Sequence, residues 1–326
     1  MNRILLSLLA ALGCFAPGAP AQDPSTSSGR VYPAKTIHIV VAYAPGGAVD
    51  LTVRLMQPRL SEALEAPVVV DNRPGAAGLI GAEFVSRAAP DGATLLYTVG
   101  ADLAIRGLKP GAFDSTRDLT PIASAVASVS CLAARASLPV NSVRELIDHA
   151  KRNPGKLTYG SSGIGSTQHL TGERMKQYGA DMVHVPFKGV APAMTALVAG
   201  EIDLSVTNLA TAMPQLRQGR IKVLAVTQAA RFEGARDIAA IDESLPGFDM
   251  PVAWYGFFGP PKLPSAIVAK LAAAIEKSLG GPELKERIAE ASMSVVFTGP
   301  GRFPAFIRET ADAYGKVIKA AGIQLD

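Results

Sequence analysis

The chain has little cysteine, histidine, aromatic content or charge. Its 326 residues include two cysteines and four histidines, aromatic residues make up 6%, and charged residues make up 18%. The histidines lie far apart and have no cysteine partners, so no metal-ligand spacing is present and we expect neither a metal nor a cofactor. The formal charge of +4 is scattered, without a basic stripe or interleaved aromatics, which argues against nucleic acid as a partner.

Signature motifs for nucleotide binding and for serine hydrolysis are also missing. Gly163-Ile164-Gly165 lacks the third glycine of G-x-G-x-x-G, and G-x-x-x-x-G-K-[ST] is absent. A G-x-S-x-G motif beginning at Gly160 would need glycine where Ile164 stands. These absences disfavour a nucleotide-binding protein, and they leave a cleft hydrolase as a less favoured alternative.

Long hydrophobic runs are absent as well, and the longest early one reads as a targeting segment. Residues 4–13 are apolar, follow Arg3, and precede an Ala-Pro-Ala sequence at 19–21 that is typical of a signal-peptide cleavage site. The run is too short to span a bilayer. We therefore expect residues 1–21 to be a cleaved signal peptide and residues 22–30 to be a flexible lead-in.

The two cysteines have different interpretations. Cys14 follows Ala-Leu-Gly, which resembles a lipid-attachment site imperfectly because the leucine stands one place too late. Simple cleavage near Ala21 is favoured, and a lipid anchor at Cys14 stays open. Cys131 lies in the apolar segment VASVSCLAA, so we expect a buried core residue rather than a nucleophile.

The rest of the chain, 48% hydrophobic overall, alternates between short β-branched runs and amphipathic runs. This alternation predicts an α/β fold with parallel sheets covered by helices. We expect strands at 36–43, 67–71, 94–99, 157–160, 182–185, 203–207, 221–227 and 252–259. We expect helices at 48–65, 79–89, 142–152, 167–178, 191–199, 210–218, 264–279, 283–291 and 302–321.

Two stretches are interpreted as crossings between domains. Residues 122–136 form an apolar run longer than most strands, and residues 245–261 place an aromatic strand between Pro and Gly residues. Two crossings predict that domain 1 is built from both chain ends and that the two domains meet at a hinged cleft. The expected boundaries are 31–126 plus 251–326 for domain 1 and 127–250 for domain 2.

Each predicted domain has one glycine loop between a strand and a helix: AYAPGGAVDL at 42–51 and YGSSGIGSTQHL at 159–170. A helix start offers unpaired N–H groups and a partial positive charge, so both loops suit an anion. Asp50 is interpreted either as a carboxylate favoured by the helix dipole or as a direct ligand contact. The second loop adds hydroxyl groups, although Ser166 or Thr167 could be an N-cap and nothing more. The hydroxyl donors expected there are those of Ser161, Ser162, Ser166 and Thr167.

Several segments together resemble a known family. They are VYPAKTIHIVVAYAPGGAVD, VVVDNRPGAAGLIGAE, RAAPDGATLL, NPGKLTYGSSGIGSTQHLTGE, DMVHVPFKG and LVAGEIDL, in this order. The chain is similar to the Bug family, the solute receptors of tripartite tricarboxylate transporters, over nearly its whole mature length. The resemblance implies a type II-like Venus flytrap in the periplasm, monomeric, that passes a small carboxylate to membrane components. A sensor subunit with a signalling partner is the alternative that the residues do not exclude.

The resemblance also implies where a carboxylate is held. Two departures from the family pattern affect specificity: Asp102 stands where relatives often have a small or hydroxyl residue, and Thr207 stands where relatives often have Asp. The candidate ligand-binding residues are Tyr43, Ala44, Pro45, Gly46, Gly47, Asp50, Gly100, Asp102, Ser162, Gly163, Ser166, Thr167 and Asn208.

Overall fold

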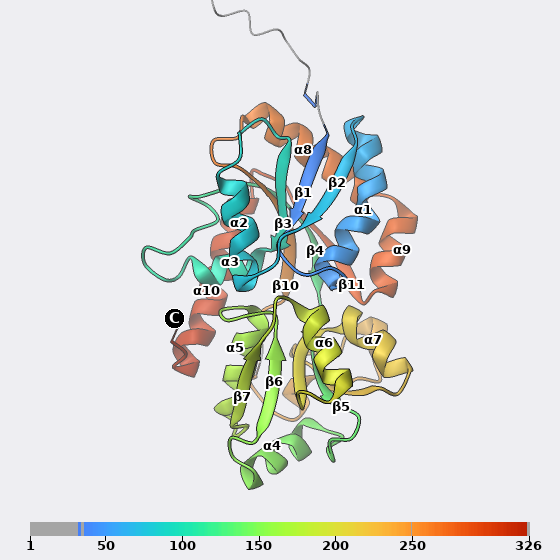
Figure 1. Ribbon diagram of the computed structural model, residues 1–326, viewed down its shortest axis with the longest axis vertical. Coiled ribbons are helices and arrows are strands. Elements are labelled where there is room, and N and C mark those ends of the chain that lie inside the picture. The colour runs from blue at the N-terminus through green and yellow to red at the C-terminus, as the bar shows by residue number, and fades with distance from the viewer. Residues whose placement is uncertain (1–31, 34–35, 249, 325–326) are drawn as a thin grey trace, which may run out of the picture. The chain divides into compact units, whose positions relative to one another are not determined.

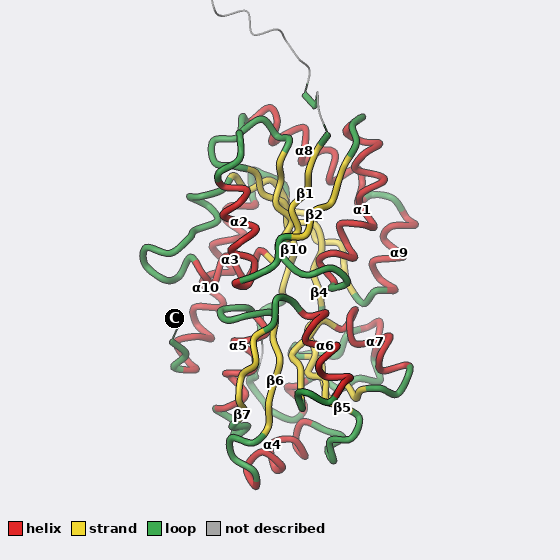
Figure 2. Tube along the Cα trace, viewed as in Figure 1, coloured by secondary structure: helices red, strands yellow, loops and turns green. Residues whose placement is uncertain are grey.

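The computed structural model describes residues 32–33, 36–248 and 250–324. The expected signal peptide, its cleavage site, Cys14 and the lead-in at 22–30 lie outside these residues. The chain divides into two units, Met1–Val31 and Tyr32–Asp326, and everything described below belongs to the second. That unit contains two separate sheets with helices packed on them (Figures 1 and 2).

The first sheet has six strands in the order β11-β4-β10-β3-β1-β2. β1 pairs in parallel with β2 and β3, whereas β10 is antiparallel to β3 and β4, and β11 is antiparallel to β4. The strands therefore come from both ends of the described chain. They are β1 (Ile37–Val41), β2 (Val68–Asn72), β3 (Thr94–Val99), β4 (Thr120–Ser128), β10 (Ala253–Gly259) and β11 (Met293–Thr298).

The second sheet has five strands in the order β7-β6-β8-β5-β9, all from the middle of the chain. β6 pairs in parallel with β7 and β8, and β5 is antiparallel to β8 and β9. The strands are β5 (Ser130–Arg135), β6 (Leu157–Ser161), β7 (Met182–Pro186), β8 (Leu204–Asn208) and β9 (Ile221–Val226).

Helices join and cover the strands, and α1 shows how an apolar stripe of a helix faces its sheet. In α1, the buried Val49, Val53, Met56 and Leu60 are spaced four, three and four residues apart, so they share one face. With the first sheet are α1 (Ala48–Leu64), α2 (Leu79–Ser86), α3 (Gly100–Arg106), α8 (Ser265–Leu279), α9 (Pro282–Glu290) and α10 (Phe303–Ala321). With the second are α4 (Val143–Arg152), α5 (Thr167–Lys176), α6 (Val190–Ala199) and α7 (Leu209–Arg217). We call the first sheet with its helices the first lobe, and the second sheet with its helices the second lobe.

The α/β class is confirmed, but the prediction of wholly parallel sheets is wrong, because both sheets are mixed. The physical reason is connectivity. β5 enters the second sheet directly from β4, with only Val129 between them, and residues 227–252 lead back into β10 without an α-helix. A parallel neighbour requires a crossover connection, usually helical, so strands reached without one run antiparallel.

The two predicted crossings differ in structure. The apolar run 122–136 contains most of β4, in the first sheet, and all of β5, in the second, so the chain passes between the sheets there. The stretch 245–261 contains β10, and the buried Trp254 is a core residue whose Nε1 donates a hydrogen bond to Thr310 Oγ1 at 2.9 Å. The numerical domain boundaries, 126/127 and 250/251, stay a prediction.

Candidate functional site

The loop after β1 is held in shape by Asp50. The Gly46 N–H donates to Asp50 Oδ2 at 3.0 Å, while Arg54 Nε and Asn72 Nδ2 donate to Oδ1 at 2.9 and 3.0 Å. Burial acts to raise the pKa of Asp50, but these hydrogen bonds outweigh it and the pKa lies below its usual value. Both carboxylate oxygens of Asp50 therefore accept hydrogen bonds from the protein itself. Asp50 holds the loop in shape, and this role explains its position better than a direct contact with a ligand does.

The same loop opens α1 without a side-chain cap. Gly47 is the N-cap, and glycine has no side chain that could accept a hydrogen bond from the helix start. The first N–H groups of α1, at Ala48 and Val49, have no carbonyl partner within the helix. Gly46 has φ +85°, a left-handed conformation that favours glycine, whereas Gly47 has φ −82°. A side chain at Gly47 would instead meet the second lobe, because an added Cβ would lie 3.3 Å from Val190 Cγ2.

The hydroxyl groups of the loop after β6 are used inside the protein. Ser166 is the N-cap of α5: its Oγ accepts the His169 N–H at 3.1 Å and donates to the Gly163 carbonyl at 2.7 Å. Ser162 and Thr167 both donate to Gln168 Oε1, at 2.7 and 3.2 Å. The expected hydroxyl donors are thus already paired, and the N-cap alternative for Ser166 is the one observed.

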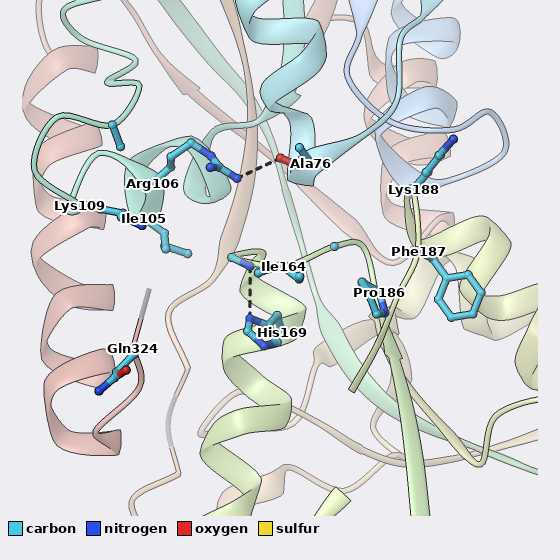
Figure 3. A pocket seen from close by; sticks show the side chains of 13 residues that line it. Ala76, Ile105, Arg106, Lys109, Ile164, His169, Pro186, Phe187, Lys188 and Gln324 are labelled. Atoms are coloured by element: carbon cyan, nitrogen blue, oxygen red, sulfur yellow. Dashed lines mark hydrogen bonds between the residues drawn. The ribbon is translucent and has the colours of Figure 1, made fainter. Parts of the chain in front are cut away.

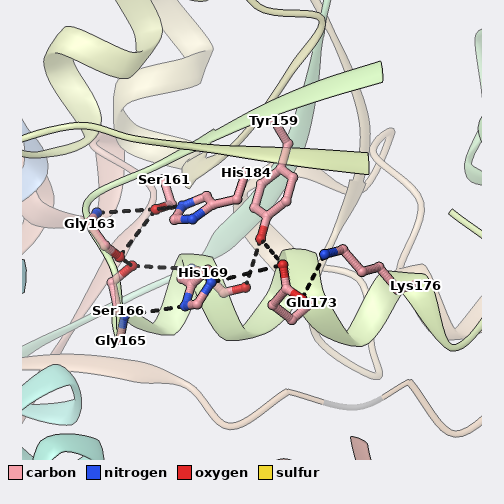
Figure 4. Close-up of polar contacts among 9 residues, drawn as sticks. All are labelled: Tyr159, Ser161, Gly163, Gly165, Ser166, His169, Glu173, Lys176 and His184. Atoms are coloured by element: carbon pink, nitrogen blue, oxygen red, sulfur yellow. Dashed lines mark hydrogen bonds and ion pairs between the residues drawn. The ribbon is translucent and has the colours of Figure 1, made fainter. Parts of the chain in front are cut away.

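A packed polar cluster lies beside this loop (Figure 4). The rings of His169 and His184 stack with centroids 4.2 Å apart, and Glu173 accepts from Tyr159 Oη at 2.8 Å and pairs with Lys176 at 2.8 Å. Burial, followed by the nearby His169, lowers the pKa of His184 to about 4. His169 Nδ1 accepts the Gly165 N–H at 3.2 Å, so this histidine is bonded locally at the start of α5.

Asp102 connects the two lobes. It lies in α3 of the first lobe with 1% of its surface exposed. Its Oδ1 accepts the Thr167 N–H of α5, in the second lobe, at 2.8 Å, and its Oδ2 accepts the Tyr43 hydroxyl at 2.6 Å. A second contact between the lobes runs from the Ala44 N–H to the Lys188 carbonyl at 3.2 Å. The two glycine loops therefore lie close together, linked through Asp102.

A small cavity of about 10 Å³ lies where the loops meet. This is room for about one water molecule. Two buried amides at the cavity keep donors without a hydrogen bond in the described structure: Asn208, and Nε2 of Gln168, whose Oε1 accepts from Ser162. The lining residues are Tyr43, Ala44, Gly47, Ala48, Val49, Val99, Ser162, Gln168, Val190 and Asn208.

Some residues of the cavity were missed from the sequence, and some candidates lie elsewhere. Gln168 was passed over, although a polar residue in the first turn after a glycine loop is a usable signal. Pro45 and Gly46 are exposed and do not line the cavity. Gly100 is buried against Trp254, because an added Cβ would lie 1.9 Å from Trp254 Cζ3, so its glycine serves packing.

A larger cavity of about 410 Å³ also receives residues from both lobes (Figure 3). Its lining includes Arg106 and Lys109 from the first lobe and His169 and Lys188 from the second, and none of the described residues that line it is acidic. Arg106 Nη2 donates to the Ala76 carbonyl at 3.1 Å. Gly163, another candidate, lines this cavity rather than the small one. The junction of the lobes is therefore positively charged on this side.

Residues 32–33, 36–248 and 250–324 contain neither a cluster of metal ligands nor a membrane-spanning helix. Within these ranges no three or more His, Cys, Asp or Glu side chains gather closely enough to hold a metal ion. No helix in the same part of the chain is both long and apolar enough to cross a membrane.

Comparison with known proteins gives a consistent result. BugT of Bordetella pertussis is 28% identical over 98% of both chains. MatC from Rhodopseudomonas palustris with bound malate is 28% identical, with a TM-score of 0.82 over 88% of this chain and 100% of that one. R. palustris Rpa4515 with adipate is 32% identical, with a TM-score of 0.84 over 89% and 98%. Residues 52–323 match the description "Tripartite tricarboxylate transporter family receptor". The chain therefore belongs to the family of tripartite tricarboxylate transporter receptors, periplasmic solute-binding proteins that include the Bug proteins.

Proposed function

We propose that this protein captures a small carboxylate between its lobes and delivers it to the membrane components of a tripartite tricarboxylate transporter. One observation carries the proposal for the site: Asn208 and Gln168, whose side-chain amides donate no hydrogen bond in the described structure, line the same small cavity as Ala48 and Val49 at the start of α1. Convergent donors without acceptors suit an anion that accepts several hydrogen bonds. The malate and adipate bound by two similar proteins support a carboxylate.

The ligand enters after the lobes part. At about 10 Å³ the cavity is too small for a carboxylate and its carbon chain, so the ligand-bound arrangement must hold the lobes further apart here than the described one does. A ligand that touches both lobes favours the arrangement in which it contacts both. The exposed Lys109 and Lys188 at the larger cavity would draw anions toward the junction.

The site we propose differs in emphasis from the candidate set. Tyr43, Ala44, Gly47, Ser162 and Asn208 remain as lining residues, with Gln168 added. Gly46, Asp50, Ser166 and Thr167 shape and position the loops, whose backbone N–H groups and amides contact the ligand. No catalytic role is proposed for any of them, because Ser166 donates to a carbonyl and not to a base.

We further propose that the mature protein begins near Gln22, works in the periplasm as a monomer and carries no lipid at Cys14. The rival role, a sensor subunit that binds the same ligand, predicts a signalling partner in place of transporter membrane components. Purification of cross-linked complexes from ligand-loaded cells separates the two: recovery of transporter membrane components supports uptake, and recovery of a signalling protein alone contradicts it.

Asn208→Ala tests the site. Because the Asn208 side chain makes no hydrogen bond in the described structure, its loss should leave the melting temperature of the free protein nearly unchanged. A hydrogen bond to a charged group contributes about 1.5–3 kcal/mol, so the affinity for the carboxylate should fall by about tenfold or more. Gln218→Ala, an exposed amide at the other end of α7, is the matched control.

The measurement is calorimetric titration of a panel that contains malate, adipate, other mono- and dicarboxylates, NAD and ATP. Ligand at about 100 times its dissociation constant stabilises the fold by about 2.7 kcal/mol, so a thermal-shift screen can first find the binder. Binding of NAD alone would contradict a carboxylate receptor, and an Asn208→Ala affinity equal to that of Gln218→Ala would contradict the proposed site.

A further inference from the structure

The start of α5 already holds a carboxylate, and the protein itself supplies it. Asp102 Oδ1 accepts the Thr167 N–H at 2.8 Å, the kind of donor that an anion takes at a helix N-terminus. Asp102 Oδ2 accepts the Tyr43 hydroxyl at 2.6 Å, and Tyr43 also lines the small cavity. With 1% of Asp102 exposed, the carboxylate is fully enclosed by the two lobes.

The surroundings of Asp102 leave its charge only partly compensated. Burial raises the pKa of Asp102 to about 6, while the hydrogen bonds from Tyr43 and Thr167 and the charge of Arg106 act to lower it. Arg106 lies one turn further along α3, and its Nη2 donates to the Ala76 carbonyl. At neutral pH Asp102 is therefore ionised, with a negative charge at the boundary of the lobes.

We propose that Asp102 is a specificity-determining residue that restricts this receptor to ligands with a single carboxylate. The inference rests on the proposed function, namely that a carboxylate is bound where the two glycine loops meet. The ligand's carboxylate takes the donors of Asn208, Gln168 and the start of α1, and Asp102 excludes a second carboxylate from the start of α5.

Two physical effects produce the exclusion. First, the Thr167 N–H and the Tyr43 hydroxyl are already paired with Asp102, so a second carboxylate would have to displace Asp102 to bind these two donors. Second, two carboxylates repel each other strongly in a space that excludes water, because the effective dielectric constant is low. Repulsion of this kind rejects the wrong ligand without adding a contact to the right one.

The test compares mono- and dicarboxylates of equal chain length. The pairs are butyrate with succinate, hexanoate with adipate, and p-toluate with terephthalate, each titrated calorimetrically at pH 7.5. For the native protein, the monocarboxylate of at least one pair should bind about tenfold or more tightly than its partner, since like charges placed together cost several kcal/mol. The ratio within a pair is the readout, because a general loosening of the fold weakens both members alike.

Three variants separate charge, occupancy and fold. Asp102→Ser removes the carboxylate and frees the Thr167 N–H, so the preference should shift toward the dicarboxylate by about tenfold or more. Asp102→Asn keeps the size and can still accept the Thr167 N–H, so it should relax the preference to a smaller extent. Asp148→Asn removes an exposed carboxylate on α4 and should leave every ratio unchanged.

The outcomes distinguish this inference from the proposed function. A native protein that prefers dicarboxylates, or an Asp102→Ser variant with the native ratio, overturns the role of Asp102 and leaves the carboxylate receptor intact. Failure of the native protein and of every variant to bind any member of a wider carboxylate panel overturns the receptor proposal, and this inference with it.

Discussion

Replacing Asp102 by asparagine should change how the stability of the fold depends on pH. Asp102 has its pKa raised from 3.8 to about 6, chiefly by burial. Between these values the folded protein holds the proton more tightly than the unfolded chain does. The contribution of Asp102 to the unfolding free energy is therefore greatest below pH 3.8, and this contribution is lost as the pH rises through about 6. The Asp102→Asn variant has no proton to release at this position, so it lacks this loss.

The magnitude follows from the same two values. At about 1.4 kcal/mol for each pKa unit, a rise from 3.8 to about 6 corresponds to about 3 kcal/mol of unfolding free energy. The neighbouring Tyr43, Tyr255 and Tyr314 have pKa values raised by burial above their usual value, so they stay neutral in this range. Groups that do not contact Asp102 have the same surroundings in both proteins, so their contributions cancel in the difference.

The assay is urea denaturation of the native protein, Asp102→Asn and the control Asp148→Asn at intervals from pH 4 to pH 8. Relative to the native protein, Asp102→Asn should gain stability by up to about 3 kcal/mol as the pH rises from 4 to 7. Any constant penalty from re-pairing the Tyr43 hydroxyl shifts the whole curve and leaves this slope. Parallel curves for the native protein and Asp102→Asn would refute the reasoning, because they would mean that Asp102 titrates at its ordinary pKa when folded.

Three further predictions concern single residues. Gly100→Ala should destabilise the fold by about 1–3 kcal/mol or more, seen as a lower melting temperature, because a Cβ would collide with the Trp254 ring, whereas Gly301→Ala, with no atom within 4 Å, should not. Ser166→Ala should cost about 1 kcal/mol of stability because the N-cap of α5 is lost. The affinity of the folded variant for the ligand should fall less than tenfold, and a larger fall would show that Ser166 contacts the ligand directly. The Cys131 thiol is buried, and burial raises its pKa, so a thiol reagent should label it in urea but not in the native protein; rapid native labelling would contradict its core position.

Most of the regular elements could be predicted because their patterns are local. The strand expected at 94–99 is β3, and the helix expected at 48–65 is α1 without its last residue. Among the strands and α-helices, four were not expected as such: β4 and β5 were predicted only as one apolar crossing, and α3 and β11 lack such patterns. Helix α3 has seven residues, too few to show a helical period, and β11 is an edge strand with an irregular register.

The sequence predicted which loops form the site, but not which hydrogen-bond donors in them are unpaired. Glycines between a strand and a helix are visible in the sequence, so both loops were found. Which hydroxyl and N–H groups remain unpaired depends on contacts between distant residues, such as the 65 residues that separate Asp102 from Thr167. Asn208 and Gln168 keep free donors, whereas Ser162 and Ser166 do not. For the same reason, the sequence alone does not distinguish these two pairs of residues.

Strand β4 has consequences for the order in which the chain can complete its fold. Its two neighbours, β10 and β11, lie more than a hundred residues further along the chain, whereas all five strands of the second sheet are present by Val226. During synthesis, β4 therefore has neither ladder partner until the last portion of the polypeptide emerges, and an unpaired apolar strand is a template for association with other chains. A truncation before Met293 would remove β11 and leave one edge of β4 open to aggregation.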